Sequence, residues 1–381
     1  MTSFGTGCKR FSTILALALL TTLTGCVLDS DDGRDPSLSE MAGGILMLGF
    51  RGQQLAEAQV IVEDIQERRV GGVILFDRDV ALGSARNIDN PGQLANLVAD
   101  LQQISGDRLL VAIDQEGGAV NRLKPTYGFP ETRSAQYFGE LDDVTETRRE
   151  AVQTASLLRT LGINVNLAPV VDLNIDPDSP AIGRFGRSYS DDPAVVVRHA
   201  HTVIDAHHEH GVATSIKHFP GHGSASEDSH LGFTDVTHTW VPQELEPYRQ
   251  LLVMNPAPSM VMTAHIFHGG LDARYPATLS QAIVGDLLRG ELGYRGLVIS
   301  DDMQMRAITD HYGLEQAIEL SLNAGVDLLI FANNLVYQPN IAADAQEIIV
   351  RLVEEGRLSA SRLREAWGRV CDLKTELELN C

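Results

Sequence analysis

The sequence predicts an α/β fold, a single (β/α)8 barrel of the TIM type. Eight short apolar runs recur along the chain, at residues 44–49, 72–76, 109–114, 164–169, 212–218, 260–265, 296–301 and 327–331. Amphipathic segments of helical period lie between them, and polar residues stand at the ends of several runs. Apolar strands that alternate with helices indicate a parallel sheet buried on both faces. Eight such units close a barrel, and a doubly wound open sheet is the alternative fold.

Residues 1–25 have the pattern of a lipoprotein signal peptide. Two basic residues precede the apolar stretch 14–20, which is too short to span a bilayer. The string LTGC, which ends at Cys26, resembles the bacterial lipobox, in which this cysteine is acylated. We therefore expect a lipid anchor on the extracytoplasmic side of a bacterial membrane, at its periplasmic or cell-surface face. An ordinary secreted protein is the alternative.

The remainder divides into a tether and one domain. Residues 26–40 are rich in Asp and contain Gly and Pro, as a flexible tether does. After residue 40 no Gly/Ser linker or change of composition interrupts the chain, so residues 41–381 are expected to form one catalytic domain. Its expected helices are residues 57–69, 91–104, 144–161, 192–209, 281–289, 314–324, 340–355 and 359–378. Cys371 and Cys381 follow near the end, and either a disulfide or two free thiols fits the sequence.

Composition excludes several classes of protein. A formal net charge of -21 argues against nucleic acid, because phosphate binding needs clustered Lys and Arg. No phosphate-binding glycine loop or dinucleotide fingerprint occurs, so no cofactor is expected. The sequence 207–210, HHEH, places only His207 and His210 on one helix face, so no metal site is expected either. We expect a monomer.

Polar residues at the ends of predicted strands indicate where the site lies. Strand three ends in Asp114, strand five in Lys217 and His218, and strand seven in Asp301. Barrel enzymes hold their chemistry at this end of the strands, because the βα loops open there. A ring of acids and cations suits a neutral ligand rich in hydroxyl groups, such as a sugar. A carboxylate such as Asp301 can stabilise or attack the oxocarbenium-like transition state of glycoside cleavage.

The loop after strand five supplies a candidate acid. In Asp228-Ser229-His230 an extended backbone would place the carboxylate and the imidazole on one side. A carboxylate beside an imidazole fixes its tautomer and raises its basicity, which a proton-transferring His requires.

Five motifs together resemble a known family. They are KHFPGHG at 217–223 with DSH at 228–230, DQEGG at 114–118, AIG at 181–183 with RSY at 187–189, and SDDM at 300–303. The combination is similar to the glycoside hydrolases of family 3, and most similar to their bacterial β-N-acetylhexosaminidases, which cleave N-acetylglucosamine from cell-wall fragments. The likeness covers about residues 42–373. It implies a retaining exo-acting β-N-acetylglucosaminidase.

The resemblance also implies residue roles. Asp301 would be the nucleophile that forms a covalent glycosyl-enzyme, with Asp302 as the alternative, and His230 would be the acid/base, with Asp228 as its partner. A His acid/base departs from the usual pair of carboxylic acids, and phosphate could then compete with water as the acceptor. The sugar-binding positions would be Asp114, Arg122, Arg187, Lys217 and His218.

Two other functions remain open at this point. One is a β-glucosidase or β-xylosidase of the same superfamily, which would normally carry a further C-terminal domain and lack the DSH loop. The other is a glycan-binding lipoprotein without turnover. The presence of both Asp301 and the Asp228-His230 pair argues against the second.

Overall fold

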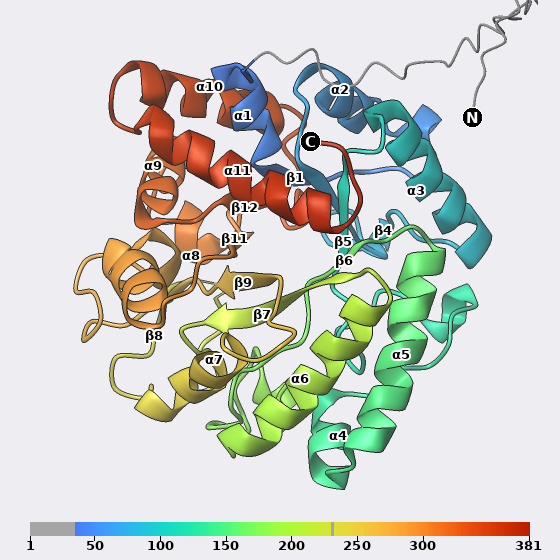
Figure 1. The fold of residues 1–381 in the computed structure, drawn as a ribbon, viewed down its shortest axis with the longest axis vertical. Helices are drawn as coiled ribbons and strands as arrows, with labels where there is room; N and C mark the ends of the chain where they lie inside the picture. Colours follow the sequence, from blue (N-terminus) through green and yellow to red (C-terminus); the bar gives the residue numbers. More distant parts are fainter. Residues whose placement is uncertain (1–34, 230–231) are drawn as a thin grey trace, which may run out of the picture. The chain divides into compact units, whose positions relative to one another are not determined.

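The computed structural model describes residues 35–229 and 232–381, and its centre is a closed barrel of eight parallel strands (Figure 1). The order around the barrel is β1-β12-β11-β9-β7-β6-β5-β2, and β1 also pairs with β2. The strands are β1 (Leu46–Gly49), β2 (Gly72–Leu75), β5 (Leu110–Ile113), β6 (Val165–Asn166), β7 (Ala213–Phe219), β9 (Met260–Thr263), β11 (Leu297–Asp302) and β12 (Leu328–Phe331). Each overlaps one of the eight predicted apolar runs, and β7 and β11 each extend one residue beyond theirs. The predicted (β/α)8 barrel is therefore confirmed, and the open sheet is excluded.

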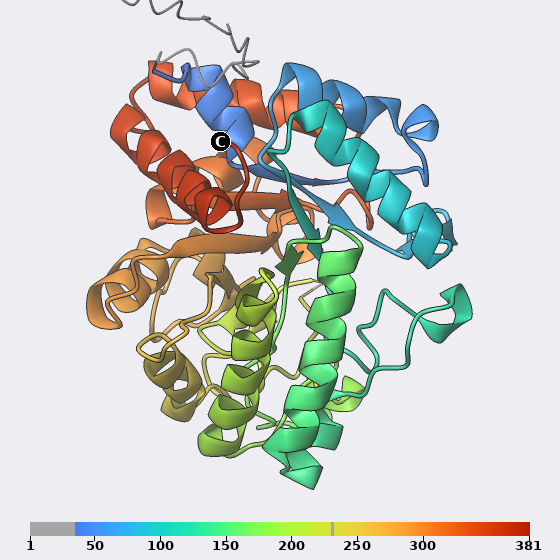
Figure 2. The same ribbon diagram turned by 45° about the vertical axis from the view of Figure 1, so that its right-hand side comes forward.

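An outer ring of helices covers the barrel (Figure 2). Its members are α2 (Gln59–Glu67), α3 (Pro91–Ser105), α5 (Val144–Thr160), α6 (Pro193–Glu209), the π-helix η6 (Gln281–Glu291), α9 (Leu314–Ala324), α10 (Ile341–Glu354) and α11 (Ala360–Glu376). Capping residues in the sequence determine where these helices begin and end. In α3, for example, the Asn90 side chain accepts from the Gln93 N–H, Pro91 fills the first helical position, and Gly106 ends the helix in the left-handed conformation.

A short helix, α1 (Leu38–Gly44), corrects one expected boundary. Residues 38–40 were assigned to the tether, but Ser37 and Glu40 form a capping box that starts α1 there. Met41 and Ala42 are then buried against the barrel, so the ordered fold begins before residue 41. The expected strand 44–49 begins only at Leu46, because Gly44 still belongs to α1. Cys26 and the leader lie outside the described residues.

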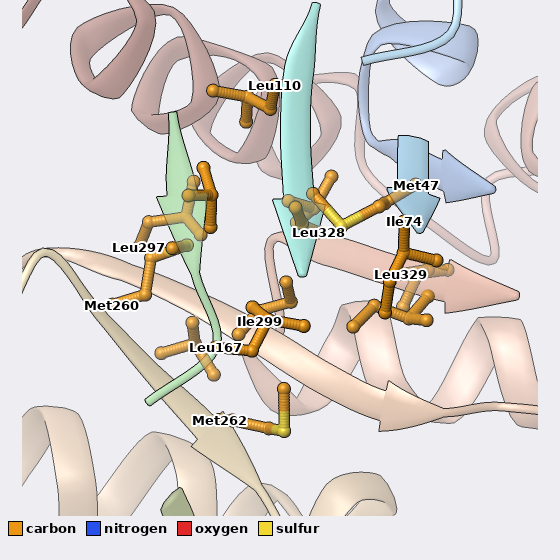
Figure 3. Close-up of a cluster of buried hydrophobic side chains, with 14 of the residues drawn as sticks. Met47, Ile74, Leu110, Leu167, Met260, Met262, Leu297, Ile299, Leu328 and Leu329 are labelled. Atoms are coloured by element: carbon orange, nitrogen blue, oxygen red, sulfur yellow. The ribbon is translucent and has the colours of Figure 1, made fainter. Parts of the chain in front are cut away.

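The barrel interior is an apolar core (Figure 3). Side chains from neighbouring strands, including Met47, Ile74, Leu110, Met262 and Ile299, are at most 3% exposed. Burial of each such side chain contributes roughly 1.5–3 kcal/mol. The core explains why the runs between turns are almost continuously apolar, and why polar side chains are left to the strand ends.

Further elements on the βα loops were not foreseen. The hairpin β3 (Arg78–Asp79) and β4 (Ser84–Ala85) follows β2, and β8 (Thr234–Asp235) pairs in parallel with β10 (Ile266–Phe267). The helices α4 (Ala135–Leu141), α7 (Glu246–Leu251) and α8 (Arg306–Thr309) lie on the same loops, with the short 3-10 turns η1 (Leu55–Glu57), η2 (Pro125–Tyr127), η3 (Gly183–Phe185), η4 (Pro242–Leu245) and η5 (Ala277–Leu279). These segments are too short for a hydrophobic period to reveal them.

The C-terminal end is fastened to the barrel. Cys371 and Cys381 form a disulfide, with 5.3 Å between their Cα atoms. The Asn380 backbone N–H and side-chain amide donate to the carbonyls of Asp107 and Gly106, in the turn that leads to β5. The structure thus selects the bridged alternative for the two cysteines. Within residues 35–229 and 232–381, no helix has the length and apolarity needed to cross a membrane.

Candidate active site

A cavity of about 190 Å³ opens at the C-terminal ends of the strands. Its polar wall contains Asp114, Arg122, Asp301 and Asp302, and its apolar wall includes Ile74, Phe76, Leu167 and Met262. The cavity is smaller than the roughly 300–1,000 Å³ pockets that hold drug-sized ligands.

The two neighbouring acids at the end of β11 have different surroundings. Asp302 is 8% exposed, and its Oδ1 accepts hydrogen bonds from the backbone N–H groups of Gln304 at 3.1 Å and Ala332 at 3.0 Å. Its carboxylate therefore joins β11 to the segment that follows β12. Asp301 is partly buried, and its Oδ1 accepts from the Asp302 N–H at 2.7 Å. Asp301 thus accepts one of these backbone hydrogen bonds, and Asp302 accepts two.

A network of buried charges adjoins the cavity through Asp114 and Arg122, which line it. Lys217 Nζ donates to Asp114 Oδ1 at 2.8 Å and lies 2.7 Å from Glu116 Oε1. Arg187 donates to both oxygens of Glu116, at 2.7 and 2.8 Å, in the bidentate geometry typical of strong Arg–carboxylate pairs. Arg122 completes the group at 3.5 Å from Asp114 Oδ2. Four of the five predicted sugar-binding side chains, Asp114, Arg122, Arg187 and Lys217, therefore lie together.

Mutual neutralisation keeps these groups charged despite their burial. Burial alone would raise the pKa of Asp114, but Lys217 and Arg122 bring it below its usual value. Burial would likewise raise the pKa of Glu116, yet Arg187 and Lys217 lower it strongly. Burial lowers the pKa of Lys217, but Asp114 and Glu116 outweigh that effect and raise it. The site therefore presents fixed charges to a ligand across the physiological pH range.

The fifth predicted sugar-binding residue, His218, is oriented by an acid. Its Nδ1 lies 2.6 Å from Asp172 Oδ2, and its backbone N–H donates to Asp172 Oδ1 at 3.1 Å. Its Nε2 lies 3.4 Å from an Arg187 nitrogen, which connects it to the charge network. Burial would raise the pKa of Asp172, but the interactions with His218 lower it. Asp172 therefore holds the ring of His218 in one orientation.

The glycines of the KHFPGHG string permit a close approach of the loop to its neighbours. Gly221 has φ 123°, and a Cβ there would lie 2.6 Å from the Cβ of Glu244. A Cβ on Gly223 would lie 1.7 Å from the carbonyl oxygen of Leu173. The Gly223 N–H donates to Glu244 Oε2 at 2.9 Å. Burial, followed by the charge of Asp172, raises the pKa of Glu244 to about 7.

The same loop leads to the candidate acid. Ser229 is 2% exposed, and its Oγ lies 3.2 Å from Nε2 of His222. Burial, together with the nearby His218, lowers the pKa of His222 to about 4, so its ring is neutral at pH 7. Asp228 directly precedes this anchored serine, and His230 lies outside the described residues.

Sequence reasoning missed the roles of two acids. Glu116 stands in the DQEGG motif and Asp172 follows the predicted strand 164–169, but neither is among the site residues predicted from the sequence. Glu116 binds the two cations Arg187 and Lys217, and Asp172 binds His218. A buried acid next to two predicted cations is recognisable only when the three-dimensional neighbours are known. His265, which ends strand six, is structural: its Nδ1 lies 2.8 Å from Thr278 Oγ1 and its Nε2 lies 2.9 Å from the Asp302 carbonyl.

The comparison with known proteins assigns the chain to a family. Residues 38–373 match the family described as "Glycosyl hydrolase family 3 N terminal domain". The chain belongs to glycosyl hydrolase family 3. This confirms the family expected from the motifs.

Relatives of this family 3 hydrolase bear similar names. It is 32% identical over 377 residues to β-hexosaminidase A of Pseudoalteromonas piscicida, covering 89% of this chain and 61% of the relative. Among solved structures, a family 3 β-N-acetylglucosaminidase from Paenibacillus sp. has a TM-score of 0.82 and 34% identity, covering 91% of this chain and 64% of the other. A β-N-acetylhexosaminidase from Beutenbergia cavernae has a TM-score of 0.79 and 30% identity, covering 90% and 99%. This chain therefore spans less than two thirds of the first two proteins and nearly all of the third.

Proposed function

We propose that this family 3 hydrolase is a retaining, exo-acting β-N-acetylglucosaminidase. It would remove a terminal N-acetylglucosamine residue from cell-wall or other glycans. The names of its relatives support the class of substrate. The observation that carries the mechanism is that Asp301 shares one small cavity with Asp114 and Arg122, while Asp302 is engaged by two backbone N–H groups.

In the proposed reaction Asp301 attacks the anomeric carbon and the bond to the leaving oxygen breaks. His230, oriented by Asp228, donates the proton to that oxygen, and the same imidazole later removes a proton from the attacking water. Asp114, Arg122, Arg187, Lys217 and His218 would bind the hydroxyl and acetamide groups of the terminal sugar. The side chains of Asp114 and Lys217 already pair with each other before a ligand binds, which favours a preorganised site.

Replacement of each β11 acid separately tests the nucleophile. We expect Asp301→Ala to lower kcat by roughly 10³-fold or more while substrate binding largely survives, because a nucleophile acts mainly in the transition state. Asp302→Asn is the control for a structural acid and should lower the unfolding temperature more than Asp301→Ala does. Turnover of 4-nitrophenyl N-acetyl-β-glucosaminide and 4-nitrophenyl β-glucoside should be measured with each enzyme, with water and with phosphate as acceptor.

Three outcomes would revise the proposal. A fully active Asp301→Ala enzyme beside an inactive but folded Asp302→Asn enzyme would transfer the nucleophilic role to Asp302. Faster cleavage of the glucoside by the unaltered enzyme would favour the β-glucosidase alternative. Formation of sugar 1-phosphate in preference to free sugar would make the enzyme a phosphorylase.

We also propose that the enzyme is lipid-anchored through Cys26 outside the cytoplasm, and that it acts as a monomer. The leader pattern of residues 1–25 supports export. The Cys371–Cys381 disulfide agrees with it, because disulfides persist in oxidising compartments. A glycan of the cell wall would be accessible from that position.

A further inference from the structure

An exposed aromatic ring lies on the loop that carries Asp228. Phe233 is 44% exposed, although exposure of a large aromatic side chain to water is unfavourable. Its ring centroid lies 5.4 Å from that of Phe267 and 5.4 Å from that of His311. These three residues, which we call the aromatic cluster, come from the loops after β7, β9 and β11. A lone exposed apolar side chain needs no explanation, but three rings gathered from three loops do.

The cluster is held on a fixed support. Phe233 directly precedes β8 and Phe267 belongs to β10, and these two strands pair in parallel. The Val236 N–H donates to the Phe267 carbonyl at 2.9 Å, and the Gly269 N–H donates to Thr237 Oγ1 at 2.8 Å. His311 follows α8, which begins four residues after Asp302. The exposed face of Phe233 is therefore presented in a defined place.

The position of the cluster relative to the proposed chemistry limits what it can bind. The cluster lies on the loops of β7, β9 and β11, which are consecutive in the barrel, and β11 carries Asp301. Asp114 and Arg122 follow β5, two strands beyond β7 in the other direction. The described lining of the 190 Å³ cavity contains none of the three rings. A sugar held between Asp301 and Asp114 would therefore leave the cluster outside, on the side of the loop that carries Asp228.

We propose that the aromatic cluster is the platform for the leaving-group sugar, with Phe233 as the residue that determines preference for a glycan over a smaller leaving group. This inference rests on the proposed function. The proton donor must stand beside the leaving oxygen, and Phe233 follows Asp228 by five residues on the same loop. The C–H face of a pyranose ring is apolar, so it stacks on an aromatic ring, while its hydroxyl groups remain in water.

Two substrates with the same terminal sugar separate this role from catalysis. N-acetyl-β-glucosaminyl fluoride has a single atom as leaving group, whereas N,N′-diacetylchitobiose has a second sugar that would lie on Phe233. We expect Phe233→Ala to lower kcat/KM for chitobiose about 3- to 10-fold, mainly through KM, and to change hydrolysis of the fluoride by less than about twofold. Phe233→Trp should restore the chitobiose value, because it retains an aromatic face.

Matched variants test whether a loss of activity in Phe233→Ala comes from a general effect on folding. Tyr137 is another exposed aromatic residue, 40% exposed on the outer helix α4, and Tyr137→Ala should leave both substrates unaffected. His311→Ala should reproduce the Phe233→Ala pattern more weakly. An equal loss on both substrates, or no loss on chitobiose, would overturn the platform while leaving the glycosidase intact. If the unaltered enzyme cleaves neither substrate, the proposed function fails first and the platform with it.

Discussion

Glu116 is a buried acid whose partners in the structure are two cations. Its two oxygens are bound by Arg187 and Lys217, both also predicted to contact the sugar. Removal of one member of such a buried network leaves the others uncompensated, at a cost of roughly 3–5 kcal/mol. Glu116 therefore positions the two cations. The neighbouring acids Asp301 and Asp302 are identical and adjacent, yet they differ in burial and in hydrogen-bond partners.

A residue-scale prediction concerns His230, whose neighbour Ser229 is anchored to His222. We expect His230→Ala to impair cleavage of chitobiose more than that of a nitrophenyl glycoside, because nitrophenolate departs almost without a proton. The glycosyl-Asp301 ester should then accumulate, since no base activates water. Azide needs no deprotonation, so it should attack the anomeric carbon, release the Asp301 carboxylate and yield a β-glycosyl azide. Product analysis by mass spectrometry detects it.

Asp228→Asn serves as the graded control for this prediction, because it leaves the imidazole present but less basic. It should show a milder form of the same pattern. Equal impairment of both substrates by His230→Ala, without rescue by azide, would place the acid/base elsewhere in the chain.

At the scale of elements, the last helix, α11, contains a buried lysine. Lys374 on α11 is 2% exposed, and burial together with the positive charges of Arg108 and Arg69 lowers its pKa to about 7. In the unfolded chain its pKa is near 10.5. Between these values the unfolded chain binds more protons than the folded one, so this lysine makes the free energy of unfolding rise as the pH increases from about 7 to 10.5.

We therefore expect Lys374→Met to stabilise the protein most at and below pH 7, where the folded chain must hold a buried charge. The advantage should diminish by on the order of 1 kcal/mol per pH unit above pH 7. Urea unfolding at several pH values from 6 to 10, with the disulfide intact, measures the difference between variant and wild type. Arg364→Met, which removes an exposed cation from the same helix, should give a difference that hardly changes with pH. A constant advantage for Lys374→Met would show that the lysine pKa is not depressed.

At the scale of the whole molecule, the proposed anchor and the proposed site use different parts of the sequence. The proposed anchor, Cys26, lies 11 residues before the cap Ser37, in a segment outside the described residues. The proposed catalytic groups come later in the sequence, between residues 228 and 301. Attachment to a membrane should therefore be separable from activity.

Substitution of the proposed anchor tests this separation. Cys26→Ser should release the enzyme from the membrane fraction into the soluble extracytoplasmic fraction with unchanged specific activity, since none of the proposed catalytic or sugar-binding residues belongs to the leader or the tether. Fractionation followed by the nitrophenyl assay measures both properties. A variant of Ser3, in the leader, provides the control for changes near the terminus. Membrane association that persists in Cys26→Ser would contradict lipid anchoring at this residue.

The sequence alone determined the barrel, because its eight apolar runs and the helices between them have distinct periods that local chain physics imposes. Expected helix 314–324 and the observed α9 coincide, and every barrel strand overlaps a predicted run. The family also followed from sequence, since the KHFPGHG and DSH strings are contiguous and need no folding to be recognised. Five candidate sugar-binding positions could be named in the same way, and their role stays a prediction.

Tertiary structure alone decided which of these residues depend on one another. Glu116 and Arg187 are 71 residues apart in the chain, and Lys217 and Asp114 are 103 residues apart, so no local pattern links them. The difference between Asp301 and Asp302 likewise depends on the Ala332 N–H, which the segment after β12 supplies. The pairing of β8 with β10, and with it the aromatic cluster, was also invisible in the sequence, because strands of two residues have no period. Local periodicity specifies elements, whereas the charges and hydrogen bonds of a site are set by neighbours that only the closed barrel brings together.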